Sequence, residues 1–231
     1  MTTILFWDID GTLLNSGGAG RVAITRAASE MIGREVDLSP VVMAGMTDWA
    51  ISAQILSHIG LSPEAVNIEI LLDLYQKHLP SGLSETEGDV IPGIFDILQT
   101  LQGREDVLSL LLTGNIEPGA WLKLSYYGLD GFFSAGGFCN ATFDRNHIAR
   151  QALTIAQEKL GIINLDKCYV IGDTPHDVSC GQYIGAKTIA IASQRYSVQD
   201  LTACNSWLVW ERFPDPARFM EKIGLDNQSV L

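Results

Sequence analysis

The feature that most constrains the fold is a set of short apolar runs separated by helical patterns. The runs are ILFWDI from Ile4, VLSLLLT from Val107, CYVIG from Cys168 and KTIAIA from Lys187. Their length and composition are typical of strands that are buried on both faces. Helical patterns follow from Pro92, Pro118, Asn146 and Pro175. This alternation predicts an α/β fold with a doubly wound parallel sheet. FFSAGGF from Phe132 is a weaker strand candidate, and SWLVW from Ser206 is a candidate edge strand.

Residues 16–88 interrupt the alternation, because they contain three helical patterns and no convincing strand. The patterns centre on Ile24, Ile55 and Leu72. We therefore expect an inserted helical subdomain over 16–88, and a core formed by 1–15 together with 89–231. NSGGAG from Asn15 is the expected outgoing linker, and SGLSETEGD from Ser81 is the expected return linker.

The charge and cysteine content narrow the class of protein. A formal net charge of −12 without a Lys/Arg-rich tract argues against nucleic acid and anionic membranes as partners. The four cysteines show no C-x-x-C pairing, so we expect reduced thiols in a cytoplasmic protein. We expect no targeting segment, and no apolar run is long enough to span a bilayer. Nothing in the sequence suggests an obligate partner, so we expect a monomer or a weak dimer.

Polar residues gather where the predicted strands end. Asp8 and Asp10 close the first strand, and Asp173 follows CYVIG. Ligands of an open α/β sheet bind outside the carboxyl ends of its strands, so these side chains should meet at one edge. Three carboxylates with few bases nearby in sequence suit a hard cation such as Mg²⁺, and the metal would attract a phosphate. The alternative is that Asp8 and Asp10 are an ordinary acidic turn.

Three segments together resemble a known superfamily. DIDGTLL, LLTGN and GDTPHD, in this order and each closing a strand, are similar to motifs one, two and four of the haloacid dehalogenase superfamily. The helical insertion after the first motif resembles the type 1 cap of phosphoglycolate phosphatase-like members. The resemblance implies a Rossmann-like core and a Mg²⁺-dependent phosphatase that acts on a small phosphorylated metabolite.

The resemblance also implies roles for individual residues. Asp8 would be the nucleophile that forms an aspartyl-phosphate, and Asp10 would be the general acid and then the general base. Asp8, Asp173 and the backbone carbonyl of Asp10 would hold Mg²⁺. The Thr113 hydroxyl and the Gly114 N–H would bind phosphoryl oxygens. The alternative for this second motif is an ordinary turn before the next helix.

The third motif departs from the superfamily pattern, which places a cation, usually Lys, before the fourth motif. The best match is Arg145, 28 positions before Asp173 at the start of the helix from Asn146. The alternative is that Arg145 is a surface charge. Asp177 has two interpretations that are compatible: a metal contact, or the third residue of a capping box with Thr174.

Several residues are weaker candidates for substrate contact. Met46 stands in GMTD, where related phosphatases often have an arginine that faces the substrate. Arg21, Thr47 and Asp48 are the remaining cap candidates, and Asn115 joins them from the second motif. The four histidines share no metal-ligand spacing and are expected at the surface or at caps.

Other functions remain open from the sequence. A dehalogenase is disfavoured, because Asp10 is present and a leaving halide needs no acid. A sugar phosphomutase of the same superfamily would need the aspartyl-phosphate to be protected from water, which the cap decides. A non-catalytic phosphate-sensing protein is the alternative from another class, and the altered third motif is its only support.

Overall fold

Six parallel strands form one sheet in the order β5-β4-β1-β6-β7-β8. The computed structural model describes residues 2–141 and 144–225. The strands are β1 (Thr3–Trp7), β4 (Val107–Leu112), β5 (Gly136–Gly137), β6 (Cys168–Gly172), β7 (Lys187–Ile191) and β8 (Leu208–Trp210). Each lies in a predicted strand segment, and the two weaker candidates are the short edge strands β5 and β8. The α/β, doubly wound sheet is confirmed.

The central strand β1 explains why its sequence is a continuous apolar run. Phe6 is paired with Leu110 of β4 on one side and Val170 of β6 on the other. Successive side chains of a strand point to opposite faces, and both faces here are covered. Ile4 and Phe6 lie in one apolar cluster, and Leu5 and Trp7 lie in the other. The strand is therefore fixed from four directions, and its carboxyl end is a rigid support for Asp8.

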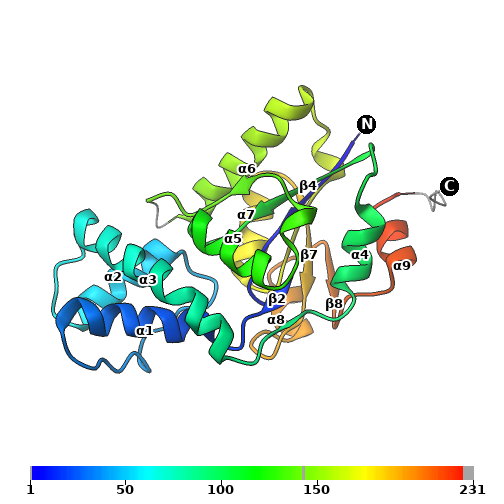
Figure 1. Ribbon diagram of the computed structural model, residues 1–231. Coiled ribbons are helices and arrows are strands. Elements are labelled where there is room, and N and C mark those ends of the chain that lie inside the picture. The colour runs from blue at the N-terminus through cyan, green and yellow to red at the C-terminus, as the bar shows by residue number, and fades with distance from the viewer. Residues whose placement is uncertain (1, 142–143, 226–231) are drawn as a thin grey trace.

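Helices cover both faces of the sheet (Figure 1). Residues of α6 (Arg145–Leu160) and α7 (Pro175–Tyr183) pack in one cluster. Residues of α4 (Ile94–Leu101), α5 (Glu117–Tyr126) and α9 (Pro216–Lys222) pack in the other. The short helices α8 (Val198–Ala203) and α9 were not predicted from the sequence. Each has at most two turns, which is too short for a helical period to stand out.

The inserted segment folds into three helices that lie to one side of the sheet (Figure 1). They are α1 (Ala19–Ile32), α2 (Asp48–His58) and α3 (Ala65–Glu85). The chain leaves the core through β2 (Leu14–Asn15) and returns through β3 (Asp89–Val90). These two short strands pair antiparallel, so both crossings lie together. We call 16–88 the cap from here on.

The predicted return linker from Ser81 is wrong in its first half. Helix α3 continues through Pro80 and ends only at Glu85. Packing against α1 maintains the helix, since Leu79 and Leu83 are buried and a Cβ at Gly82 would lie 2.8 Å from the Ala19 carbonyl oxygen. This close approach stabilises the helix beyond a proline that would otherwise weaken it.

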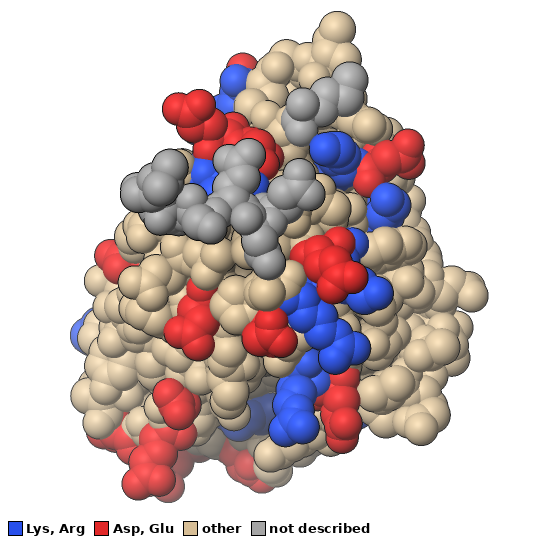
Figure 2. All heavy atoms as spheres, turned by 90° about the vertical axis from the view of Figure 1, so that its right-hand side faces the viewer, with Lys and Arg blue, Asp and Glu red and all other residues tan. Residues whose placement is uncertain are grey.

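The structure shows how charge is distributed on one face and which state the cysteines are in. On the face that carries α4 and α9, basic and acidic side chains are interspersed rather than gathered into a basic field (Figure 2). Within the described residues, the helices are all too short or too polar to cross a membrane. All four cysteines are free thiols, and burial raises the pKa of Cys168 to about 11.

Candidate active site

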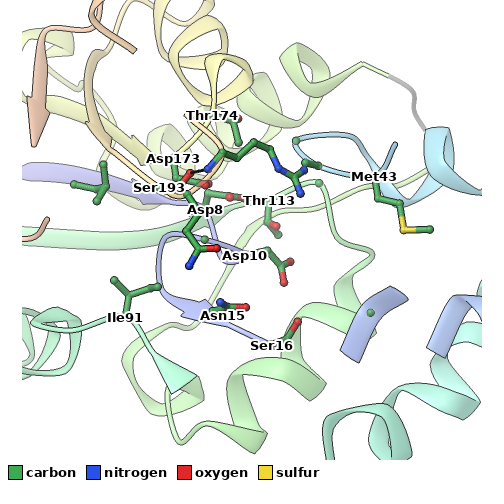
Figure 3. A pocket seen from close by; sticks show the side chains of 18 of the residues that line it. Asp8, Asp10, Asn15, Ser16, Met43, Ile91, Thr113, Asp173, Thr174 and Ser193 are labelled. Carbon is green, nitrogen blue, oxygen red and sulfur yellow. Dashed lines mark hydrogen bonds between the residues drawn. The ribbon is translucent and has the colours of Figure 1, made fainter. Parts of the chain in front are cut away.

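A cavity of about 1350 Å³ lies between the carboxyl end of the sheet and the cap. Asp8, Asp10, Thr113 and Asp173 line it from the core, and Met43 lies across it on the cap (Figure 3). The cavity also brings together five more predicted residues: Arg21, Asp48, Gly114, Asn115 and, from the third motif, Arg145. Thr47 and Asp177, both described, do not line it.

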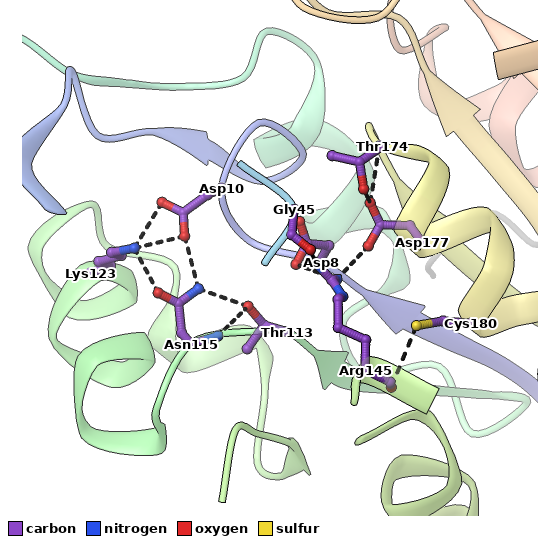
Figure 4. Close-up of polar contacts among 10 residues, drawn as sticks. All are labelled: Asp8, Asp10, Gly45, Thr113, Asn115, Lys123, Arg145, Thr174, Asp177 and Cys180. Atoms are coloured by element: carbon purple, nitrogen blue, oxygen red, sulfur yellow. Dashed lines mark hydrogen bonds and ion pairs between the residues drawn. The ribbon is translucent and has the colours of Figure 1, made fainter. Parts of the chain in front are cut away.

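Asp8 lies in a buried cluster of charges at the end of β1. A guanidinium nitrogen of Arg145 lies 3.3 Å from Asp8 Oδ1 and 2.5 Å from Asp177 Oδ1. The other terminal nitrogen donates to the Gly45 carbonyl of the cap at 3.2 Å (Figure 4). Arg145 itself is buried, so it is not a surface charge. The structure thus places the cation predicted for the third motif beside the predicted nucleophile.

The charges of this cluster do not balance. Asp8, Asp173 and Asp177 have carboxylate oxygens within 4.8 Å of one another, and one arginine faces them. Burial, more than any neighbour, raises the pKa of Asp8, and Asp177 adds to the rise while Arg145 opposes it. Burial, then Asp177, raises the pKa of Asp173 to about 7. Without another cation, the cluster resists full ionisation.

The residues fit a divalent metal ion. Asp173 Oδ1 is buried, and the described part of the chain offers it no hydrogen-bond partner. A Cβ at Gly11, whose φ is +92°, would lie 2.5 Å from Asp173 Oδ2, so only glycine leaves room for this carboxylate. The three aspartates are the one such acidic group found among the described residues. Oxygen ligands with excess negative charge are the donor set that hard divalent cations prefer.

Asp177 has the structural role that the sequence predicted as one of two interpretations. Its Oδ2 accepts from the Thr174 N–H at 3.0 Å and from the Thr174 hydroxyl at 2.7 Å, and the pair forms the predicted capping box at the start of α7. Its Oδ1 accepts from Arg145. Both oxygens are therefore already bound by protein donors.

Asp10 points away from this cluster, toward a second cation (Figure 4). The Lys123 ammonium lies 2.8 Å from Asp10 Oδ1 and 2.6 Å from Oδ2. The Asn115 amide donates to Asp10 Oδ2 at 2.8 Å and accepts from Lys123 at 2.7 Å. Burial would lower the pKa of Lys123, but Asp10, then Tyr75 and Asp48, outweigh it and raise that pKa. The ammonium therefore stays charged.

Lys123 is the site residue that the sequence reasoning missed. It lies on α5 and is buried together with Ala120 and Leu124. The sequence did contain a sign of this role, because residues three and four apart share one face of a helix. Lys123 follows Ala120 by three residues, and Ala120 follows Ile116 by four, so the lysine lies on the apolar face, where a charge requires a partner.

The second motif forms a loop whose groups suit phosphate binding. Thr113 Oγ1 accepts from the Asn115 side chain at 2.7 Å and from its backbone N–H at 3.3 Å, so its own proton is free to be donated. Gly114 lies directly under the cap, since a Cβ there would lie 2.6 Å from the Met46 carbonyl oxygen.

The substrate-contact candidates on the cap differ in the hydrogen bonds that they make within the protein. Arg21 donates to the carbonyl oxygens of Leu38 and Val41, at 2.8 and 3.0 Å, and still lines the cavity. Thr47 caps α2 by accepting from the backbone of that helix.

Asp48 joins the cap to the core. It donates its N–H to the Gly114 carbonyl and accepts from the Ile116 N–H, both at 2.8 Å. Burial, opposed by Lys123 and the Ile116 N–H, raises the pKa of Asp48 to about 6. Both of these contacts are therefore made to the core loop.

Comparisons with known proteins place this geometry in a family. No curated protein matches the chain in sequence. Among solved structures, CbbY from Rhodobacter sphaeroides in complex with phosphate has a TM-score of 0.73 at 14% identity, over 92% of this chain and 95% of that one. A hydrolase from Pseudomonas syringae has a TM-score of 0.69 at 20% identity, over 97% and 98%. A predicted phosphoglycolate phosphatase from Haemophilus somnus 129pt has a TM-score of 0.69 at 12% identity, over 96% and 98%.

At these sequence identities, the similarity to the solved structures is a similarity of fold. The family model described as haloacid dehalogenase-like hydrolase matches residues 4–191, from the first strand to the end of β7. That span holds every site residue described above, in the order in which the motifs were found. The chain belongs to the haloacid dehalogenase-like hydrolases.

Proposed function

We propose that this protein is a Mg²⁺-dependent phosphatase that hydrolyses a small phosphomonoester through an aspartyl-phosphate on Asp8. The observation that carries the proposal is the separation of the two aspartates. Asp8 lies with Arg145, Asp173 and Asp177 in a cluster that has an excess of negative charge, whereas Asp10 lies apart and is paired with Lys123. Two carboxylates in such different settings can take different roles, and a metal bound beside Asp8 would keep it ionised for attack.

Asp8 and Asp173 would hold Mg²⁺, together with the backbone carbonyl of Asp10. Bound there, the ion supplies positive charge that offsets the repulsion between the Asp8 carboxylate and a phosphate dianion. We assign Asp177 to positioning rather than to direct metal contact, because Thr174 and Arg145 occupy its two oxygens.

The chain's own residues then perform two displacements. A carboxylate oxygen of Asp8 attacks the phosphorus while the ester P–O bond breaks, and Asp10 gives its proton to the leaving alkoxide oxygen. Water next attacks the aspartyl-phosphate and gives a proton to Asp10, and the bond between Asp8 and phosphorus breaks. Inorganic phosphate leaves, and both carboxyl groups return to their starting states.

The remaining core residues stabilise the transferring group. The Thr113 hydroxyl and the Gly114 N–H would donate to phosphoryl oxygens. Arg145, whose two carboxylate partners outweigh its burial and favour its charged form, would bind the developing negative charge. Phosphoryl transfer depends mainly on such positioning and charge stabilisation.

The cap side of the cavity bears on the choice of substrate. Ile24, Met43, Ile51 and Tyr75 line the cap side of the cavity, and Arg21 is the basic cap residue there. We retain Arg21 as a substrate contact and assign Thr47 and Asp48 to holding the cap on the core. CbbY has been crystallised with phosphate and, as a mutant, with xylulose-(1,5)bisphosphate, which agrees with a phosphorylated metabolite as substrate. We also propose a cytoplasmic monomer or weak dimer.

Phosphate release from a panel of phosphomonoesters, with Mg²⁺ and with EDTA, tests the proposal. We expect at least one ester to be hydrolysed by the wild type with Mg²⁺, and none by Asp8→Asn. Absence of Mg²⁺-dependent release from every ester would count against a phosphatase. Conversion of a hexose 1-phosphate to its 6-phosphate without release would instead identify a mutase.

A further inference from the structure

We propose that Lys123 is a positioning residue that holds the Asp10 carboxylate in its working orientation, and that the cap completes the site in which Lys123 sits. This inference rests on the proposed function of Asp10 as acid and base. It assigns a role to a buried cation that lies outside the motifs of the sequence.

The contacts of Lys123 leave little freedom to Asp10. The ammonium binds both oxygens of that carboxylate, at 2.6 and 2.8 Å. The Lys123 side chain is 5% exposed, whereas the Asp10 side chain is 42% exposed. A buried ammonium stays where its partners are, while an exposed carboxylate without a partner samples several rotamers. Lys123 is therefore the fixed member of the pair.

Asn115 links this pair to the phosphate-binding loop. Its amide oxygen accepts from Lys123, which leaves its amide nitrogen to donate to Asp10 and to Thr113 at 2.8 and 2.7 Å. The amide orientation is thus fixed by three partners. The position of Asp10 is coupled through Asn115 to the hydroxyl that is placed to bind a phosphoryl oxygen.

The cap supplies the other side of the Lys123 site. Tyr75 of α3 is buried, and its hydroxyl lies beside the Lys123 ammonium. A Cβ at Gly20 of α1 would lie 3.7 Å from that hydroxyl and 3.9 Å from the Lys123 ammonium nitrogen. Two cap helices therefore enclose an ammonium group that comes from the core. The orientation of Asp10 is complete only when the cap lies against the sheet.

The test compares leaving groups in Lys123→Met, which is unbranched and one atom shorter and replaces a buried charge by an apolar group. An alkyl phosphate needs a proton from Asp10 as it leaves, whereas p-nitrophenolate leaves without one. We expect the rate of the first step, measured as phosphoenzyme formation in a single turnover, to fall about 100-fold for the alkyl ester and about threefold or less for p-nitrophenyl phosphate, with the half-saturating substrate concentration changed by less than about threefold. Tyr75→Phe should lower the first-step rate for the alkyl ester by about threefold.

Lys159→Met, at an exposed lysine of α6, is the matched control, and its kcat should stay within about twofold of wild type. An equal fall of the first-step rate for both esters in Lys123→Met would overturn the proposal, because it would indicate a general structural defect. An unchanged first-step rate for the alkyl ester in both Lys123→Met and Tyr75→Phe would overturn it as well.

Crystal structures of wild type and Lys123→Met separate this inference from the proposed function. We expect the Asp10 side chain to leave its wild-type rotamer in the variant. An unchanged rotamer would overturn the positioning role even if the wild type hydrolysed neither ester, whereas that lack of hydrolysis would contradict the proposed phosphatase.

Discussion

The two aspartates of the first motif lie two residues apart and belong to opposite electrostatic settings. Around Asp8, three buried carboxylates face a single arginine, and the pKa values of Asp8 and Asp173 are raised. Around Asp10, one half-exposed carboxylate is matched by one buried lysine and one amide. We refer to these as the Asp8 half and the Asp10 half of the site.

The difference shows how one strand end supports two kinds of chemistry. The Asp8 half has an excess of negative charge, so it is stable only when a cation or protons bind. The side chains of the Asp10 half are balanced by the chain itself, so their charge needs no metal to offset it. Variants in the Asp10 half should therefore leave the response of stability to Mg²⁺ intact, whereas variants in the Asp8 half should change it.

The largest effect is expected from Asp8→Asn. This variant removes the nucleophile and should lower kcat by about 10⁴-fold or more for every ester. It also removes one charge from a crowded cluster, so the metal-free protein should unfold at a higher urea concentration than wild type at neutral pH. Phosphate release and urea unfolding followed by circular dichroism measure the two effects. Residual activity within about tenfold of wild type would exclude Asp8 as nucleophile.

Arg145→Ala should have the next largest effect. Loss of a cation that binds the transferring phosphoryl group should cost about 2 kcal/mol or more of transition-state stabilisation, which is about 30-fold in kcat/KM. Arg150→Ala is the matched control, because Arg150 lies on the same helix, exposed, over the Tyr183 ring. If the two variants are equally active, Arg145 is not the cation of the third motif.

The pH dependence of stability should report the charge excess of the Asp8 half. The pKa of Asp173 is raised from 3.8 to about 7, so between these values the folded state holds a proton that the unfolded state has lost. The free energy of unfolding of the metal-free protein should therefore fall as pH rises from about 4 to about 7.

Saturating Mg²⁺ should oppose that fall, because it binds the ionised form in the folded state. Asp173→Asn should remove most of both effects. Urea midpoints at about pH 5 and about pH 8, with Mg²⁺ or EDTA, measure them. A midpoint of the metal-free wild type that rises with pH would contradict the charge excess.

The smallest effect is expected from Asn115→Ala in the Asp10 half. It removes hydrogen bonds to Asp10 and Thr113 but no charge, so kcat for an alkyl phosphate should fall about tenfold. Its stabilisation by Mg²⁺ should match that of wild type, in contrast to Asp173→Asn. Thermal unfolding with and without Mg²⁺ makes this comparison, and a lost response in Asn115→Ala would mean that the two halves are not independent.

Much of the core followed from local sequence. The β1 segment reads as a strand because both of its faces are buried, so every position from Thr3 to Trp7 is covered. Asp8 and Asp173 were found because strand ends share one edge of a sheet. The two-turn helices α8 and α9 were missed, since so few residues do not establish a period.

The parts that were not predicted depend on tertiary contacts. The extension of α3 past Pro80 depends on its approach to α1, which lies far away in sequence. The pairing of Lys123 with Asp10 joins residues separated by more than a hundred positions. A helical pattern shows that Lys123 lies on the apolar face, but it does not show which carboxylate the lysine meets.

Burst kinetics with p-nitrophenyl phosphate test the division of labour between Asp8 and Asp10 most directly. Asp10→Asn retains the nucleophile and needs no acid for this leaving group, but it lacks the base for the second step. We expect Asp10→Asn to release about one p-nitrophenolate per enzyme in a fast burst, followed by slow turnover, and a mass increase of one phosphoryl group on Asp8. Asp8→Asn should give no burst and no phosphoenzyme. A burst in Asp8→Asn, or a phosphoryl group found on Asp10 in the wild type, would contradict the account.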